Sequence, residues 1–147
     1  MPSLNYFINT LSRCGALLRA ARLENTELSA HDTAYLFCVC RHPNLSQEAL
    51  GKRLAVNKSN VTRRLAALEE KGFVTRTPSP QDRRVLLVNP TQKALDALPL
   101  LRTIGREWMD AITKGFTEQE TAQFEALLAR ALENARATIE REVPPCD

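Results

Sequence analysis

The stretch from Asn57 to Gly72, NKSNVTRRLAALEEKG, restricts the possible folds of this chain more than any other segment. Asn57 is a favourable N-cap, and Gly72 suits the left-handed residue that ends many helices. On a helical wheel Val61, Leu65 and Leu68 form one apolar stripe, whereas the opposite face of the first turns carries hydroxyl, amide and guanidinium groups. The segment is therefore predicted to be a helix with one buried face and a polar, basic N-terminal end.

A short helix is predicted before this segment and a β-hairpin after it. Ser46 is placed to cap the run QEALGKRLA, from which Ala49, Leu50 and Leu54 face inward. After Gly72 come two short β-prone runs, FVTRT and VLLVN, which the polar loop PSPQDRR separates. Two helices joined by a turn, followed by an arginine-tipped hairpin, describe a winged helix-turn-helix.

The same central segment is the basic part of the chain. Residues 46–84 contain nine Lys and Arg against four Asp and Glu, although the 147-residue chain has a net charge of only +3. Such an uneven distribution is expected of a module that meets a polyanion. It favours nucleic-acid binding by the central part and a different role for the flanks.

The candidate DNA contacts lie on the predicted recognition helix, at the start of the helix before it, and on the wing. Arg, Asn, Ser and Thr at the N-terminal end of a recognition helix can read base edges, and the other cations can hold phosphates or enter the minor groove. The expected contact residues are Ser46, Gln47, Lys58, Ser59, Asn60, Thr62, Arg63, Arg64, Arg76, Arg83 and Arg84. The alternative is a solvated helix face and a solvated loop.

Apolar stripes at both ends of the chain predict long amphipathic helices. The first runs from Leu4 to about Glu24, and a nearly all-apolar helix, capped by Ser29, is expected over residues 30–41. Two further long helices follow the hairpin, with Thr117 and Glu120 forming a capping box between them. These stripes either pack on each other within one chain or on a second copy. A homodimer is favoured because it places two recognition helices in successive major grooves, about 34–36 Å apart.

From Leu28 to Thr91 the chain resembles the DNA-binding domain of MarR-type transcriptional regulators. The resemblance rests on Leu50, Leu54, the Val61-Thr62-Arg63 step, LEEKGFVTR, and Asp82-Arg83-Arg84 before the second wing strand. It implies a mainly α fold with a small β-hairpin wing. A winged helix-turn-helix domain at 29–92 would then be flanked by dimerisation helices at 1–28 and 93–147.

The resemblance also implies a function and a role for single residues. It implies a homodimer that binds a pseudo-palindromic operator, most often as a repressor, and that a small ligand or thiol oxidation releases. Asp82 is expected to brace Arg83 at the wing tip. Ala94 stands where the family usually has a glycine, which leaves the hinge into the following helix less defined.

Many relatives of this type bind a small aromatic acid between the dimer helices and the winged domain. The residues expected to line such a pocket here are Arg13, His31, Tyr35 and Trp108, each of which alternatively has a purely structural role. Cys14 in the first helix is a candidate redox sensor or a structural thiol. Cys146, near the end of the chain, is expected to be an exposed, oxidisable thiol.

Metal, membrane and catalytic functions find little support in the sequence. Cys38 and Cys40 point about 200° apart on a helix, so they cannot share a metal ion, and neither metal nor cofactor is expected. Without an export signal or a membrane-length apolar run, we expect a cytoplasmic protein with reduced thiols. The five glycines are unclustered, which argues against an enzyme with a glycine-rich cofactor loop, such as a methyltransferase. The competing interpretations are a winged helix used only for protein contact and a dimerisation module related to methyltransferases.

Overall fold

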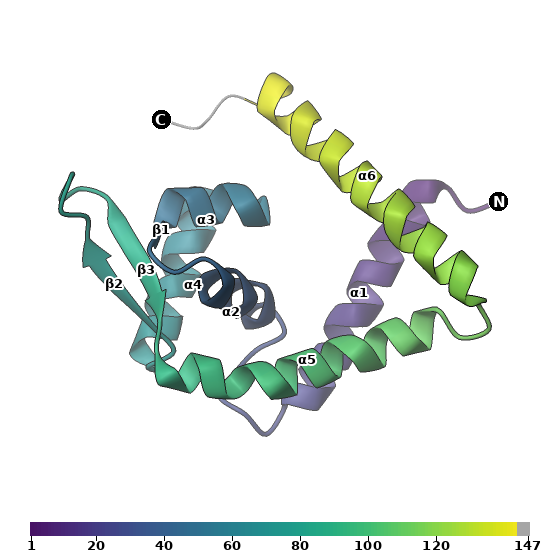
Figure 1. Ribbon diagram of the computed structural model, residues 1–147, viewed down its shortest axis with the longest axis horizontal. Coiled ribbons are helices and arrows are strands. Elements are labelled where there is room, and N and C mark those ends of the chain that lie inside the picture. The colour runs from purple at the N-terminus through teal and green to yellow at the C-terminus, as the bar shows by residue number, and fades with distance from the viewer. Residues whose placement is uncertain (144–147) are drawn as a thin grey trace. The chain divides into compact units, whose positions relative to one another are not determined.

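The computed structural model describes residues 1–143 and shows a mainly α-helical chain with a small antiparallel sheet, as the sequence predicts (Figure 1). The chain divides into two compact units, residues 1–108 and the part that follows from Met109. In chain order the elements are α1 (Leu4–Leu23), α2 (Asp32–Arg41), β1 (Leu45–Ser46), α3 (Gln47–Leu54), α4 (Lys58–Glu70), β2 (Val74–Pro78), β3 (Leu86–Pro90), α5 (Gln92–Ile112) and α6 (Glu118–Glu142).

The predicted helix at residues 57–72 is α4, and its buried stripe is the predicted one. Asn57 accepts a hydrogen bond from the amide of Asn60 and caps the helix. Val61, Leu65 and Leu68 are buried. Gly72 adopts a φ of 81°, the left-handed conformation in which a side chain is strained. The amide of Phe73 then donates to the carbonyl of Leu68, so the chain turns directly into the first wing strand.

The turn between α3 and α4 brings the two helices into close contact. Ser46 caps α3 by accepting from the amide of Ala49, and Ala55 ends the helix in the left-handed region at a φ of 53°. A Cβ added to Gly51 would lie 3.0 Å from Cγ2 of Val61. Glycine at this position therefore lets α3 approach α4 closely.

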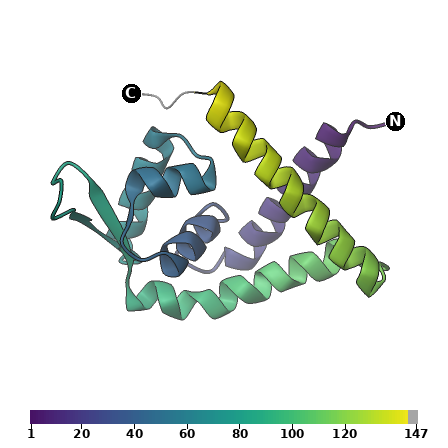
Figure 2. The same ribbon diagram turned by 45° about the horizontal axis from the view of Figure 1, so that its top comes forward.

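The wing is a three-stranded sheet rather than the two-stranded hairpin that the sequence predicts. Strand β3 lies in the middle and pairs antiparallel with β1 and β2, in the order β1-β3-β2. The additional strand β1 is two residues long, too short to give a periodic signal, and pairs Leu45 with Val88. Figures 1 and 2 both show the β2–β3 hairpin projecting from one end of the helices α2 to α4.

The second helix begins later than predicted. It starts at Asp32 rather than Ala30, and its N-cap is His31, whose side chain makes no capping bond. Ser29 is not the cap, because the buried carboxylate of Asp32 instead accepts a hydrogen bond from the Ser29 amide. The residues before Asp32 form a turn closed by a bond from the Asp32 amide to the Ser29 carbonyl.

Helix α5 joins the winged core through buried residues between Ala94 and Ile104. Ala94, Leu101 and Ile104 are buried in the same cluster as the α4 stripe. Ala94 is fully buried there, and the hydroxyl of Thr91 holds the preceding turn by donating to the carbonyl of Gly72. The junction between β3 and α5 is thus packed and hydrogen bonded, with Ala94 at the position where the family usually has a glycine.

Helices α1 and α6 expose much of their apolar surface. In α1 the exposed large hydrophobic side chains include Leu4, Phe7, Ile8 and Leu11, although Gly15 lies directly against the ring of Trp108 and Arg22 forms an ion pair with Glu107. In α6, which the predicted Thr117–Glu120 capping box begins, none of the described residues is buried. Its exposed apolar residues are Leu127, Leu128, Leu132 and Ile139.

Candidate nucleic-acid interface

The first turns of α4 present an exposed polar face whose side chains are held by one another. Lys58, Ser59, Asn60 and Arg63 are all exposed. The hydroxyl of Ser59 donates to the Asn57 side-chain oxygen over 3.0 Å, and a guanidinium nitrogen of Arg63 donates to the side-chain oxygen of Asn60. The face opposite the buried stripe is therefore a connected set of donors and acceptors that faces solvent.

At the wing tip Asp82 holds Arg84, not Arg83 as expected. The Asp82 carboxylate accepts three hydrogen bonds of 3.1 Å from Arg84, one from its backbone amide and two from its guanidinium. Aspartate readily bonds the amide two residues later in a turn, and here that bond brings the following side chain onto the same carboxylate. These hydrogen bonds hold the pKa of Asp82 below its ordinary value. Arg83 is exposed and has no ion-pair partner within residues 1–143.

Arg64 is directed into the protein and not toward the exposed face of α4. One guanidinium nitrogen lies 3.4 Å from a carboxylate oxygen of Asp32 and 3.3 Å from the hydroxyl of Ser29. Lys71 adds a second cation 3.7 Å from the other Asp32 oxygen. Because the Asp32 side chain is only 1% exposed, these cations compensate a buried charge. Arg64 thus joins α4 to the start of α2, and the phosphate contact expected of it stays a prediction.

Arg76 is likewise engaged inside the winged domain. Its side chain is only 17% exposed and forms an ion pair with Glu69, 3.2 Å away. A further guanidinium nitrogen donates to the side-chain oxygen of Gln47 over 3.4 Å, and the Gln47 amide donates to the hydroxyl of Thr62 over 2.9 Å. Arg76, Gln47 and Thr62, all expected to contact DNA, are therefore occupied with one another. Ser46 is occupied as the cap of α3.

Of the cations expected to contact DNA, the four that are exposed come from two elements of the winged domain. Lys58 and Arg63 belong to the first turns of α4, and Arg83 and Arg84 belong to the loop between β2 and β3. The surface of these four cations, together with Ser59 and Asn60, is referred to below as the basic face. A helix end and a hairpin tip with this chemistry are suited to the major groove and to the adjoining backbone or minor groove.

The four residues expected to line an effector pocket differ in their surroundings, and the pocket stays a prediction. Arg13 and His31 are exposed, whereas Tyr35 belongs to the core and Trp108 packs over Gly15. Burial raises the pKa of the Tyr35 hydroxyl above its ordinary value, which the positive charge of Arg64 partly offsets. None of these four residues lines the α2–α5 groove described next.

A groove that the sequence did not indicate lies between α2 and α5. Its volume is about 430 Å³, and it is lined by Phe37, Cys40, Arg41, Leu98 and Arg102. The lining residues on each helix have helical spacing, but periodicity cannot tell which faces of two distant helices meet. Burial raises the pKa of the Cys40 thiol, and the nearby Arg102 lowers it by a smaller amount. The groove combines an aromatic ring with two cationic side chains.

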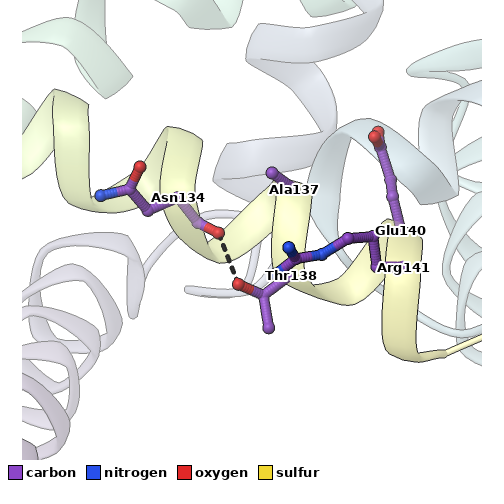
Figure 3. A pocket seen from close by; sticks show the side chains of 5 residues that line it. All are labelled: Asn134, Ala137, Thr138, Glu140 and Arg141. Atoms are coloured by element: carbon purple, nitrogen blue, oxygen red, sulfur yellow. Dashed lines mark hydrogen bonds between the residues drawn. The ribbon is translucent and has the colours of Figure 1, made fainter.

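A second concave area lies along α6 alone (Figure 3). Its residues are Asn134, Ala137, Thr138, Glu140 and Arg141, and the hydroxyl of Thr138 donates to the backbone carbonyl of Asn134. A ligand site needs side chains that converge from several directions. Since all five residues come from one helix, this area gives no evidence of a binding site.

The thiols and possible metal ligands are dispersed. Cys14 is exposed on α1, whereas Cys38 and Cys40 are half-buried in α2, and burial raises the pKa of both of these thiols. Cys146 lies outside the described residues. Within residues 1–143 no group of His, Cys, Asp and Glu side chains is arranged to hold a metal ion, and no helix is long and apolar enough to cross a membrane.

Comparison with known proteins gives a consistent assignment. Residues 28–86 match the MarR family. The uncharacterized HTH-type transcriptional regulator YybA of Bacillus subtilis is 27% identical over 127 residues, which cover 86% of this chain and 85% of YybA. The crystal structure of MarR matches with a TM-score of 0.88 and 26% identity over 95% of both chains.

A putative MarR family regulator from Listeria monocytogenes, whose structure contains a 26mer DNA, shares the fold. It matches with a TM-score of 0.87 at 20% identity, over 100% of this chain and 99% of that one. The winged helix-turn-helix, the match over residues 28–86 and the relatives along most of the chain agree with one another. Over residues 28–86 the chain matches the MarR family, and along most of its length it is similar to HTH-type transcriptional regulators.

Proposed function

We propose that this protein is a repressor that binds a pseudo-palindromic DNA operator as a homodimer. The observation that carries the proposal is the basic face, where the exposed start of α4 and the wing arginines belong to one compact unit. The buried stripe of α4 fixes which side of that helix is left for DNA. The DNA complex of the Listeria relative supports the same use of this fold.

We assign the expected contact residues to three groups. Ser59, Asn60 and Arg63 are the proposed readers of base edges, because their side chains are exposed on the first turns of α4. Lys58, Arg83 and Arg84 are the proposed contacts to phosphates or the minor groove. The proposed supporting residues, whose side chains form hydrogen bonds within the winged domain, are Arg64, Arg76, Gln47, Thr62 and Ser46.

The proposed homodimer is supported by the exposed apolar residues of α1 and α6. Leu4, Phe7, Ile8 and Leu11 on α1 and Leu127, Leu128 and Ile139 on α6 are each more than 40% exposed. Contiguous apolar surface on a water-soluble chain usually marks an interface. A two-fold dimer would also give two basic faces, which a pseudo-palindromic site with half-sites one helical turn apart requires.

The proposed effector is a small aromatic acid, for which the α2–α5 groove is a second candidate site beside the one expected at Arg13, His31, Tyr35 and Trp108. Phe37 and Leu98 supply apolar surface, and Arg41 and Arg102 are cations that can pair with a carboxylate. Oxidation of the exposed Cys14 is the second possible release signal. We further propose that the protein acts in the cytoplasm and has no catalytic activity.

Titration with benzoate tests the proposed groove. Replacing Arg102 with Ala should weaken benzoate binding, measured by calorimetry, because one of two carboxylate partners is removed. Arg106→Ala is the matched control, since Arg106 is exposed on the same helix and does not line the groove. Equal benzoate binding by the two variants would contradict this location of the effector site.

Two arginine variants test the DNA contacts separately. Arg63→Ala should cost about 1–3 kcal/mol at one base position and relax the sequence preference there. Arg84→Ala should weaken binding to all sequences and reduce the slope of log affinity against log salt by about 1. If Arg63→Ala bound a preferred and a random duplex as the wild type does, the proposed recognition role of α4 would be wrong.

A further inference from the structure

We propose that Glu69 and Arg76 are positioning residues that set the wing against the recognition helix and so determine sequence specificity without touching DNA. The inference rests on the DNA-binding function proposed above. Its basis is a chain of hydrogen bonds that runs from the last turn of α4 through β2 and α3 back to the first turn of α4.

The series of hydrogen bonds begins at the Glu69 carboxylate, which contacts strand β2. One carboxylate oxygen accepts from the backbone amide of Arg76 over 2.8 Å. The other accepts from two nitrogens of the Arg76 guanidinium, over 3.2 Å and 3.4 Å. Because β2 is an edge strand, this amide is a donor on the open side of the sheet. Glu69 therefore fixes both the backbone and the side chain of the first wing strand to α4.

The series of hydrogen bonds continues from Arg76 to α3 and to the first turns of α4. Arg76 donates to the side-chain oxygen of Gln47 at the start of α3. The Gln47 amide donates to the hydroxyl of Thr62, which in turn donates to the backbone carbonyl of Lys58 over 3.0 Å. Arginine is only a donor, so its bond orients the Gln47 amide with the nitrogen toward Thr62. In this series of hydrogen bonds each side chain donates to the next group in the same direction, from Arg76 to Gln47, Thr62 and the Lys58 carbonyl.

This arrangement couples three elements that must meet DNA together. The wing arginines follow β2 in the chain, and the residues proposed to read bases lie in the first turns of α4. If the bonds between β2 and α4 are lost, the wing can shift relative to the recognition helix. Binding to the preferred sequence requires all contacts at once, whereas binding to random DNA does not. The protein should then lose more affinity for the preferred sequence than for random DNA.

The charge of Glu69 allows a sharp test. Glu69 is an anion on the same helix as the basic face, so by electrostatics alone Glu69→Gln should strengthen binding to every DNA sequence. A positioning role predicts the opposite for the preferred sequence. Glu70→Gln is the matched control, because Glu70 is exposed, adjacent on α4, and outside the hydrogen-bond chain.

The experiment uses the full chain and a duplex that the wild type selects from a random-sequence library. Fluorescence anisotropy then gives the affinity for this duplex and for a scrambled one at several KCl concentrations. For Glu69→Gln we expect about a tenfold loss of affinity for the selected duplex, as for a lost charge-assisted hydrogen bond. Its affinity for the scrambled duplex and its salt slope should match those of Glu70→Gln.

Arg76→Lys provides a second variant that keeps the positive charge. Lysine cannot reproduce the fork of donors that holds Glu69 and Gln47, so specificity should fall as it does in Glu69→Gln. Circular dichroism and thermal unfolding confirm that each variant is folded.

Two results would overturn the inference. One is a Glu69→Gln protein that binds the selected duplex as tightly as Glu70→Gln does. The other is an Arg76→Ala protein whose salt slope falls by about 1, because this would make Arg76 a direct phosphate contact. A wild-type protein that selects no consensus would instead refute the DNA-binding function itself, and the positioning role with it.

Discussion

Replacing Gly51 with alanine has two opposing effects on the free energy of unfolding. Gly51 lies within α3, where alanine is favoured over glycine by about 1 kcal/mol on helix propensity alone. The added Cβ would, however, lie 3.0 Å from Cγ2 of Val61 and 3.2 Å from the carbonyl oxygen of Val56. Overpacking of this kind costs about 1–3 kcal/mol. The Val56 backbone is held by a 3.0 Å hydrogen bond to the Gly51 carbonyl, so it cannot easily move away.

We therefore expect Gly51→Ala to lower the free energy of unfolding by about 1 kcal/mol, because the steric term is the larger of the two. Urea unfolding followed by circular dichroism at one fixed protein concentration measures this quantity. Gly105→Ala is the control, since a Cβ at that helical position meets nothing within 4 Å. It should gain up to about 1 kcal/mol. If Gly51→Ala gained as much stability as Gly105→Ala, the close approach of α3 and α4 would be refuted.

Two further predictions concern the buried Asp32 and the half-buried thiols of Cys38 and Cys40. Asp32→Asn should lower the free energy of unfolding by about 1–3 kcal/mol. This loss is smaller than for a fully buried ion pair, because the side chains of Arg64 and Lys71 are each about a third exposed. Urea unfolding beside the exposed control Asp110→Asn checks this value, and equal stability of the two variants would argue against a buried ionic link. Burial raises the pKa of the Cys38 and Cys40 thiols, so both should react with iodoacetamide more slowly in the folded protein than in urea. Because the folded state disfavours these thiolates, its stability should also fall as the pH rises above the ordinary thiol pKa. Identical pH profiles of alkylation, followed by mass spectrometry in the folded and unfolded chain, would contradict the assigned burial.

The elements that the sequence predicted well are those with a local physical signal. Asn57, the stripe from Val61 to Leu68 and Gly72 specify α4 by cap, period and stop, and the structure confirms all three. Strand β1 gave no such signal, because two residues cannot show a period. The start of α2 was misplaced because the buried Asp32 and its partners on α4 determine that turn, and neither partner is local in sequence.

The candidate site shows the same division between local and tertiary information. A helical wheel placed Ser59 and Arg63 on the outer face of α4, where the structure has them. It could not show that Arg64 faces Asp32, or that Arg76 would find Glu69 and Gln47, because those partners depend on packing between elements. The sequence therefore identified the basic segment, but it could not identify the partners that its individual basic residues have within the fold.

The most direct test of the account measures DNA binding by the unmodified protein across salt. Fluorescence anisotropy compares the duplex from the region upstream of its own gene with a scrambled duplex of equal length. We predict tight binding to the first, much weaker binding to the second, and a steep loss of affinity as KCl rises, since phosphate contacts release counterions. Equal and weak binding to both duplexes would contradict a sequence-specific regulator, and the basic face would then be an ordinary charged surface.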